Sequence, residues 1–138
     1  MPAGKVIRLQ YVTREMVRAD PTTLFVFGDN IARTGLGGQA KAMRGEPNAI
    51  GVPTKWRPGR AERDYFTDDD AELFQVRDPI ICAFHAMENA LISGRNVAIP
   101  ADGLGTGLAE LPRRAPRIHR AIEARITALE NLASREST

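Results

Sequence analysis

The chain has 138 residues, of which 43% are hydrophobic and 26% charged, the size and composition of one globular domain. Its 19 basic and 17 acidic residues leave a formal net charge of +2, too small an excess to indicate a dedicated nucleic-acid-binding protein. A lone cysteine, Cys82, excludes an internal disulfide and any metal site built on several cysteines.

The first half of the chain alternates short apolar segments with short helical ones. We expect strands over Val6–Val12, Leu24–Gly28 and Ala49–Thr54. The second of these is apolar on both faces, which is typical of a central strand covered by helices on both sides. Short helices are expected between the strands, over Arg14–Ala19 and from about residue 38 to residue 45.

The second half contains longer helices. A polar stretch over residues 55–70 predicts a long loop, and long loops in compact domains are usually functional or disordered. The spacing of apolar residues then predicts a helix from Pro79 to Ser93, with Asp78 as its N-cap. A fourth strand over residues 96–101 and a closing helix over residues 116–133 complete the chain. The closing helix should turn one apolar stripe inward, formed by Ile118, Ile122, Ile126 and Leu129.

Strands that alternate with helices predict one α/β domain over residues 1–138, with a mostly parallel, mixed sheet between helices in three layers. In such sheets ligands bind beyond the carboxyl ends of the strands. Three of the expected strands end in polar or glycine-rich segments, GDN, PTK and PADGLGTG. We therefore expect Asn30, Lys55 and Asp102 on one rim of the sheet.

Two of these strand ends lead into glycine-rich loops, GLGGQAKAM at 35–43 and GLGTGL at 103–108. Glycine lets the backbone approach a ligand closely, and outward-facing N–H groups before a helix form an anion site. Two facing loops of this kind suit a diphosphate. Neither loop is a Walker A or a GxGxxG motif, and glycine turns that bind nothing are the alternative interpretation.

Several other features carry expectations of their own. Cys82 lies in the apolar run IICAF, so we expect it to be buried. His85 and His119 have no companion at metal-ligand spacing, so we expect neither a metal site nor a cofactor. No apolar run approaches the ~18 residues of a membrane span, and no signal peptide is evident, so we expect a cytoplasmic protein with no membrane partner.

The order of the motifs resembles that of macro domains. GDN followed by GLGGQAKAM resembles their first ligand loop, and IPADGLGTGLAELP resembles the second, which cradles a phosphate. The chain is also similar to small phage-associated macro-like proteins, and the likeness runs from about residue 23 to residue 112. The resemblance implies binding of ADP-ribose or a related NAD-derived nucleotide.

Carried over position by position, the resemblance implies a set of ligand contacts. Asn30 would contact the distal ribose, and the glycines of the two loops would hold the diphosphate. The residues assigned to ligand binding are Gly28, Asp29, Asn30, Gly35, Gly37, Gly38, Gln39, Gly103, Gly105, Thr106 and Gly107.

Hydrolysis of ADP-ribosyl linkages is a second expectation, from similarity to terminal ADP-ribose protein glycohydrolase. That subgroup uses a strand-end lysine, which Lys55 matches, and an acid whose place falls near Ala109. Glu110 and Asp102 are substitutes for that acid, and Asp102 is our candidate partner of Lys55 in catalysis. The acid of the commoner hydrolytic subgroup is absent from residues 39–41, so binding alone is the leading hypothesis.

Arginines supply the rival hypothesis, a module associated with nucleic acid. They lie in the polar loop, at Arg57, Arg60 and Arg63, and in RRAPRIHR at 113–120. The same loop carries Trp56, Tyr65 and Phe66, and an aromatic ring there would stack on a base. The alternatives are a loop packed by its own Trp56 and ion pairs between the second cluster and nearby glutamates. A structural protein with empty glycine loops is the third hypothesis.

Overall fold

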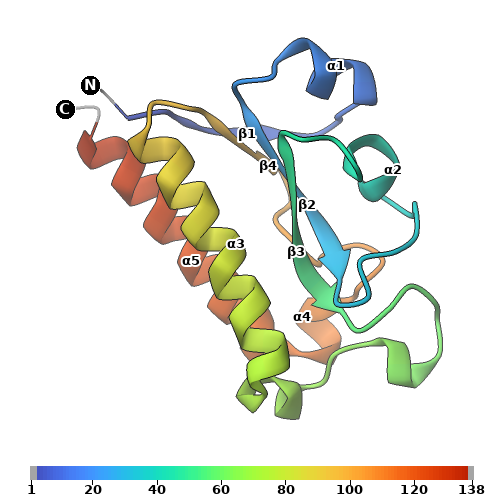
Figure 1. Ribbon diagram of the computed structural model, residues 1–138. Coiled ribbons are helices and arrows are strands. Elements are labelled where there is room, and N and C mark those ends of the chain that lie inside the picture. The colour runs from blue at the N-terminus through green and yellow to red at the C-terminus, as the bar shows by residue number, and fades with distance from the viewer. Residues whose placement is uncertain (1–2, 137–138) are drawn as a thin grey trace.

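The computed structural model describes residues 3–136 and shows one four-stranded sheet (Figure 1). Its strands are β1 (Val6–Leu9), β2 (Leu24–Asn30), β3 (Ala49–Lys55) and β4 (Val97–Pro100). They lie in the order β1–β4–β2–β3, and every strand pair is parallel within the described residues. The predicted α/β class is confirmed. The antiparallel element that a mixed sheet implies is limited, in this part of the chain, to one bridge between residues 55 and 65.

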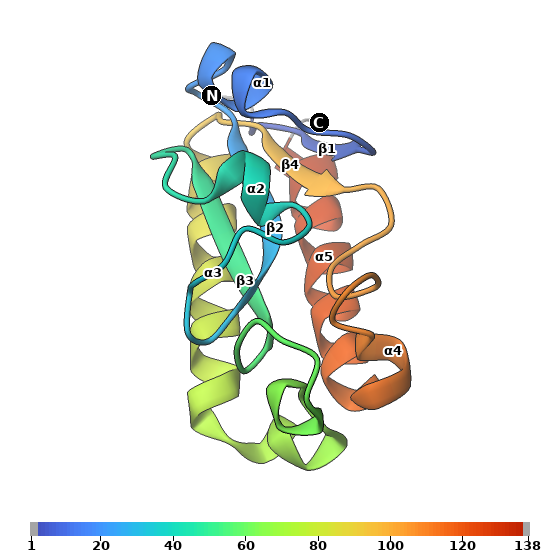
Figure 2. The same cartoon turned by 90° about the vertical axis from the view of Figure 1, so that its right-hand side faces the viewer.

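Helices cover both faces of the sheet and make three layers. The long helices α3 (Phe74–Ile92) and α5 (Pro116–Glu136) lie on one face (Figures 1 and 2). The short helices α1 (Arg14–Ala19) and α2 (Ala40–Met43) lie on the other, and α4 (Leu111–Arg114) precedes α5. None of the helices within residues 3–136 combines the length and the apolar character needed to cross a bilayer.

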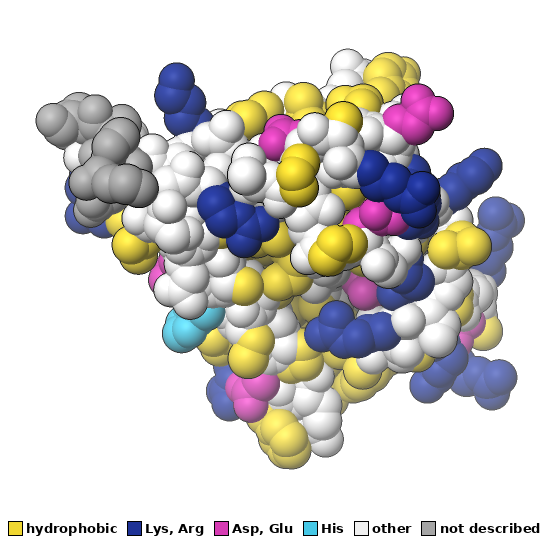
Figure 3. All heavy atoms as spheres, turned by 45° about the horizontal axis from the view of Figure 1, so that its top comes forward, with side chains coloured by type: hydrophobic (Ala, Val, Ile, Leu, Met, Phe, Trp, Pro, Cys, Tyr) yellow, Lys and Arg dark blue, Asp and Glu magenta, His cyan; other side chains and the backbone are white. Residues whose placement is uncertain are grey.

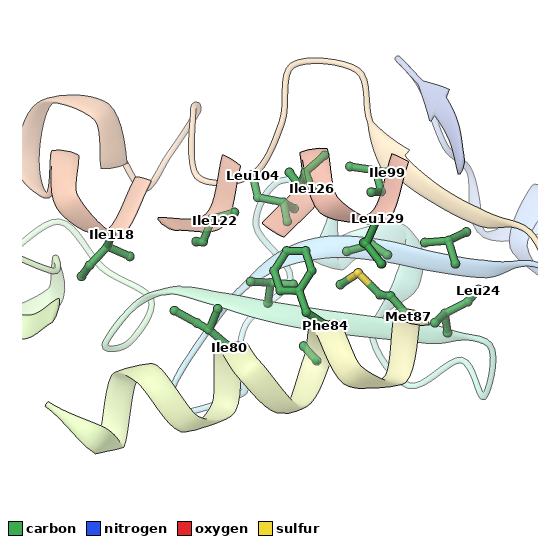
Figure 4. Packing of buried hydrophobic residues seen from close by; sticks show 14 of the residues in the cluster. Leu24, Ile80, Phe84, Met87, Ile99, Leu104, Ile118, Ile122, Ile126 and Leu129 are labelled. Carbon is green, nitrogen blue, oxygen red and sulfur yellow. The ribbon is translucent and has the colours of Figure 1, made fainter. Parts of the chain in front are cut away.

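The larger of the two cores lies under α3 and α5. Figure 4 shows Phe84 and Met87 of α3 pointing toward Ile126 and Leu129 of α5, and all four side chains are buried. Burying a side chain of this size contributes about 1.5–3 kcal/mol to folding. The inward stripe predicted for the closing helix is confirmed in full, because Ile118, Ile122, Ile126 and Leu129 are all buried.

The predicted start of α3 is wrong. The helix begins at Phe74, so Pro79 lies inside it and Asp78 is not its N-cap. The buried Val76 lies one turn before Ile80 and extends the apolar stripe toward the amino terminus. Packing of this extra turn outweighs the hydrogen bond that Pro79 cannot donate.

Cys82 is exposed, so its predicted burial is also wrong. The residue lies two positions from both Ile80 and Phe84, which are buried. At 3.6 residues per turn, two positions carry a side chain to the far side of a helix. The apolar run around Cys82 therefore includes residues of both helix faces.

Other boundaries differ by a few residues. β1 ends at Leu9 rather than Val12, while β2 and β3 extend to Asn30 and Lys55 because these two residues pair with each other. The polar loop is ordered by two 3₁₀ helices, Glu62–Asp64 and Asp68–Glu72.

A buried carboxylate lies at the end of β2. Asp29 is 5% exposed, and a Cβ atom built on Gly51 of the neighbouring strand would lie 2.4 Å from its Oδ2 atom. Glycine at position 51 thus leaves the space that the Asp29 side chain fills.

We expect Gly51→Ala to lower the free energy of unfolding by roughly 1–3 kcal/mol, since the added methyl group overpacks a buried charged group. Urea unfolding followed by circular dichroism measures the change. Gly107→Ala is the matched control, because no atom lies within 4 Å of its Cβ position. Equal midpoints for the two variants would contradict the close approach of Asp29 to Gly51.

Candidate functional site

A cleft of about 680 Å³ opens beyond the carboxyl ends of the strands. Its walls come from the loop after β2, the end of β3 and the loop after β4, and Figure 2 shows the loops that follow β2 and β4 beside each other. The volume falls within the ~300–1,000 Å³ of typical small-molecule sites.

The structure brings all the predicted site residues to this cleft. They are Gly28, Asp29, Asn30, Gly35, Gly37, Gly38, Gln39, Lys55, Asp102, Gly103, Gly105, Thr106 and Gly107. The expectation that the two glycine loops and Lys55 share one rim is therefore confirmed. The binding and catalytic roles of these residues stay predictions.

The first loop is closed by the side chain of Asn30. Its Nδ2 atom donates to the carbonyl of Thr34 at 2.9 Å, and its Oδ1 atom accepts from the Thr34 amide at 3.4 Å. Gln39 reaches back to the strand, where its Oε1 atom accepts from the Gly28 amide at 3.3 Å. Asn30 and Gln39 thus shape the wall of the cleft that they line.

The second loop is anchored at both ends by buried leucines, Leu104 and Leu111. The amide of Leu111 donates to the carbonyl of Gly105 at 2.8 Å, which closes the loop. Gly105 has a φ of +80°, and its Cβ position lies 2.7 Å from the Leu111 side chain, so glycine is required there on both grounds. Leu108, which is 60% exposed, lies 3.5 Å from the Cβ position of Gly38 and brings the two loops into contact.

Lys55 lies at the β3 end of the cleft beside an aromatic ring. Its Nζ atom donates to the carbonyl of Gly59 at 2.5 Å and lies 4.4 Å from the ring centroid of the buried Tyr65. Partial burial lowers the pKa of Lys55, the charge of Asp64 opposes this shift, and the guanidinium of Arg114 adds to it. The amine is therefore easier to deprotonate than that of a solvated lysine.

Glu110 lines the same cleft as Lys55, and its charge, like the stronger one of Asp64, acts on the pKa of this lysine. The charge of Glu110 favours the protonated form of Lys55 and so opposes the effect of burial. The Arg113 guanidinium, through its hydrogen bond, is the main cause of the lowered pKa of Glu110. Glu110 has a φ of +50°, an uncommon conformation for a residue with a side chain. Asp102 lines the cleft on an exposed part of the second loop.

The sequence does not predict that Tyr65 and Arg114 lie at the Lys55 end of the cleft. Arg114 lies with its Cζ atom 3.7 Å from the centroid of the Tyr65 ring, and Tyr65 forms the antiparallel bridge with Lys55. These contacts join residues from distant parts of the sequence. No local signal predicts them.

The polar loop is packed by its own tryptophan, as one of the two interpretations proposed. The Nε1 atom of Trp56 donates to Oδ2 of Asp70 at 3.1 Å, and the ring packs edge-on against Phe66 with centroids 5.3 Å apart. The ring is thus engaged inside the loop rather than presented to a base.

Most arginines of the second cluster form ion pairs within the protein. Arg113 pairs with Glu110, Arg114 with Glu62, and Arg117 with Glu72. Figure 3 shows basic side chains gathered toward one side of the face in view, with acidic side chains among them. The ion pairing expected as one explanation of this arginine cluster is therefore present, and the nucleic-acid hypothesis stays a prediction.

A model of a protein family described as a family of unknown function, DUF7831, matches residues 7–125. The chain belongs to this family. No curated protein and no solved structure matches the chain. The family match includes both glycine loops and every residue that lines the cleft.

We expect the ammonium group of Lys55 to lose its proton below the ordinary lysine pKa of 10.5, because burial disfavours its charged form. NMR detection of reductively ¹³C-methylated lysines measures this directly, since the chain contains only Lys5, Lys41 and Lys55. Lys55→Arg assigns the signal, and the same signal in urea-unfolded protein is the reference. Identical titration in the folded and unfolded states would contradict the desolvation of Lys55.

The same shift has a consequence for stability. Between its lowered folded pKa and 10.5, Lys55 binds fewer protons in the folded state than in the unfolded state. Its contribution to the free energy of unfolding therefore rises with pH across that window. Lys55→Met should remove this rise when its urea unfolding is compared with that of the original protein.

Proposed function

We propose that the chain binds ADP-ribose or a related NAD-derived nucleotide in the cleft between its two glycine-rich loops. The observation that carries this proposal is the convergence of both loops and Lys55 on one cleft. Backbone N–H groups of two facing loops suit the four oxygens of a diphosphate better than a single phosphate. The resemblance to macro domains points to the same ligand.

The strand order supports an elongated ligand. The central strands β4 and β2 carry the two glycine loops, while Gln10 follows β1 at one edge and Lys55 ends β3 at the other. Neighbouring strands lie ~4.8 Å apart, so the cleft crosses roughly 14 Å of sheet. With the diphosphate bound at the centre, the base would lie near Gln10, and the distal sugar would lie near Lys55 and Tyr65.

We expect titration calorimetry to give heat with ADP-ribose and weaker binding with AMP, which lacks the second phosphate and the distal ribose. Gly107→Val should weaken ADP-ribose binding at least tenfold, because the new side chain occupies open space at the cleft wall. Gly107→Ala, with its smaller side chain, is the graded control. No heat at millimolar ADP-ribose would end the proposal.

A second candidate function, hydrolysis of an ADP-ribosyl ester, is favoured by the lowered pKa of Lys55 in a cleft that Glu110 also lines. The neutral amine would attack the anomeric carbon, forming a C–N bond as the C–O bond to the leaving carboxylate breaks. The proton released from the amine passes to Glu110, and water then cleaves the C–N bond to free the sugar. Asp102, the acid favoured from sequence, is the competing proton acceptor.

We expect Lys55→Ala to abolish release of ADP-ribose from an ADP-ribosylated peptide while calorimetric binding changes only a few-fold. Lys41→Ala is the control, because Lys41 is exposed on α2 and does not line the cleft. Glu110→Gln and Asp102→Asn, assayed side by side, identify the acid. Unchanged turnover in Lys55→Ala would remove Lys55 from the mechanism.

A further inference from the structure

One arginine connects the first glycine loop to the sheet. The guanidinium of Arg44, just beyond α2, donates to the carbonyl of Gly35 at 2.7 Å and to that of Thr34 at 3.1 Å. It also donates to both carboxylate oxygens of Asp29, at 2.5 and 3.3 Å. Its Cζ atom lies 5.6 Å from the ring centroid of Phe27, so the fork packs on the strand that the loop leaves.

Asp29 is the fixed end of this connection. Its side chain is 2% exposed, and its Oδ1 atom also accepts from the amide of Asn30 at 2.8 Å. A carboxylate this deeply buried needs a charged partner. Arg44 therefore neutralises Asp29 and joins the end of β2 to the loop with a single side chain.

The first glycine loop needs such a connection. Residues 32–39 are exposed, and Arg33, Gly35 and Gly38 all have positive φ values. Asn30 closes the beginning of the loop at Thr34, and hydrogen bonds to α2 begin at Gly37. The hydrogen bond from Arg44 to the carbonyl of Gly35 holds the part of the loop between these two sets of hydrogen bonds.

We propose that Arg44 is a positioning residue, which holds the first glycine loop in the shape that lines the cleft and thereby sets the affinity for the ligand. The second half of this statement rests on the proposed function, whereas the first concerns the ligand-free protein alone. The planar fork of arginine matches four acceptors that the compact ammonium of lysine cannot reach together.

Arg44→Lys is the decisive variant, because it retains a cation beside the buried Asp29 and removes the fork. In the ligand-free protein, we expect hydrogen exchange over residues 31–39 to become at least tenfold faster, with exchange in α3 and α5 unchanged. The Kd for ADP-ribose should rise at least tenfold in the same variant.

Arg33→Gln is the matched control. This substitution removes the guanidinium of Arg33, which belongs to the same loop and lies 3.8 Å from the Asp29 carboxylate. It leaves the contacts of Arg44 intact. We expect exchange over residues 31–39 and the Kd to change less than threefold. A loss as large as that of Arg44→Lys would show that net charge matters and overturn the positioning role.

The remaining outcomes separate this proposal from the proposed function. Unchanged loop exchange in Arg44→Lys overturns the positioning role, and weakened binding without faster exchange would instead identify Arg44 as a direct phosphate contact. Faster exchange with an unchanged Kd overturns the link to affinity. Faster exchange in a protein whose original form binds no ADP-ribose supports the loop-holding role and overturns the proposed function.

Discussion

Parallel pairing of β2 with both of its neighbours is the constraint on which the cleft depends. Because β2 pairs with β3 on one side and β4 on the other, the carboxyl ends of all three strands reach the same edge. Each strand then places one part of the site at that edge: β2 and β4 each lead into a glycine loop, and β3 ends at the amine of Lys55. If one of these strands ran in the opposite direction, its loop or side chain would lie at the opposite edge of the sheet.

The ion pair between Asp29 and Arg44 and the ammonium group of Lys55 differ in what stabilises their charges. Asp29 is a buried carboxylate that the partly exposed Arg44 neutralises, so that pair is structural. Lys55 is half-buried and faces opposing influences, since Asp64 and Glu110 favour its charged form while burial and Arg114 disfavour it. The lowered pKa of Lys55 is the net result of these opposing influences.

How much the sequence predicts follows from the range of the interactions involved. The bounds of α1 and the inward stripe of α5 depend on neighbours within a few positions, and the sequence predicts both. The glycine loops could be placed on one rim because strand ends are visible in the apolar pattern. Arg44 and Tyr65 could not be assigned, because their partners lie 9 to 49 positions away.

The failures of prediction in α3 have one physical cause. Local rules start a helix at a proline and bury a cysteine among apolar neighbours, but packing against the sheet decides both. Val76 extends the buried stripe past Pro79, and that stripe turns Cys82 outward. The free energy gained when a tertiary contact buries a whole side chain exceeds these local conformational preferences.

The outward position of Cys82 makes the molecule convenient to label. It is the chain's one thiol, it is exposed on α3, and no residue of α3 lines the cleft. A maleimide dye or a surface tether attached there modifies a single site and leaves the glycine loops untouched. The fold thus offers a built-in handle for fluorescence or immobilisation without the need to engineer a cysteine.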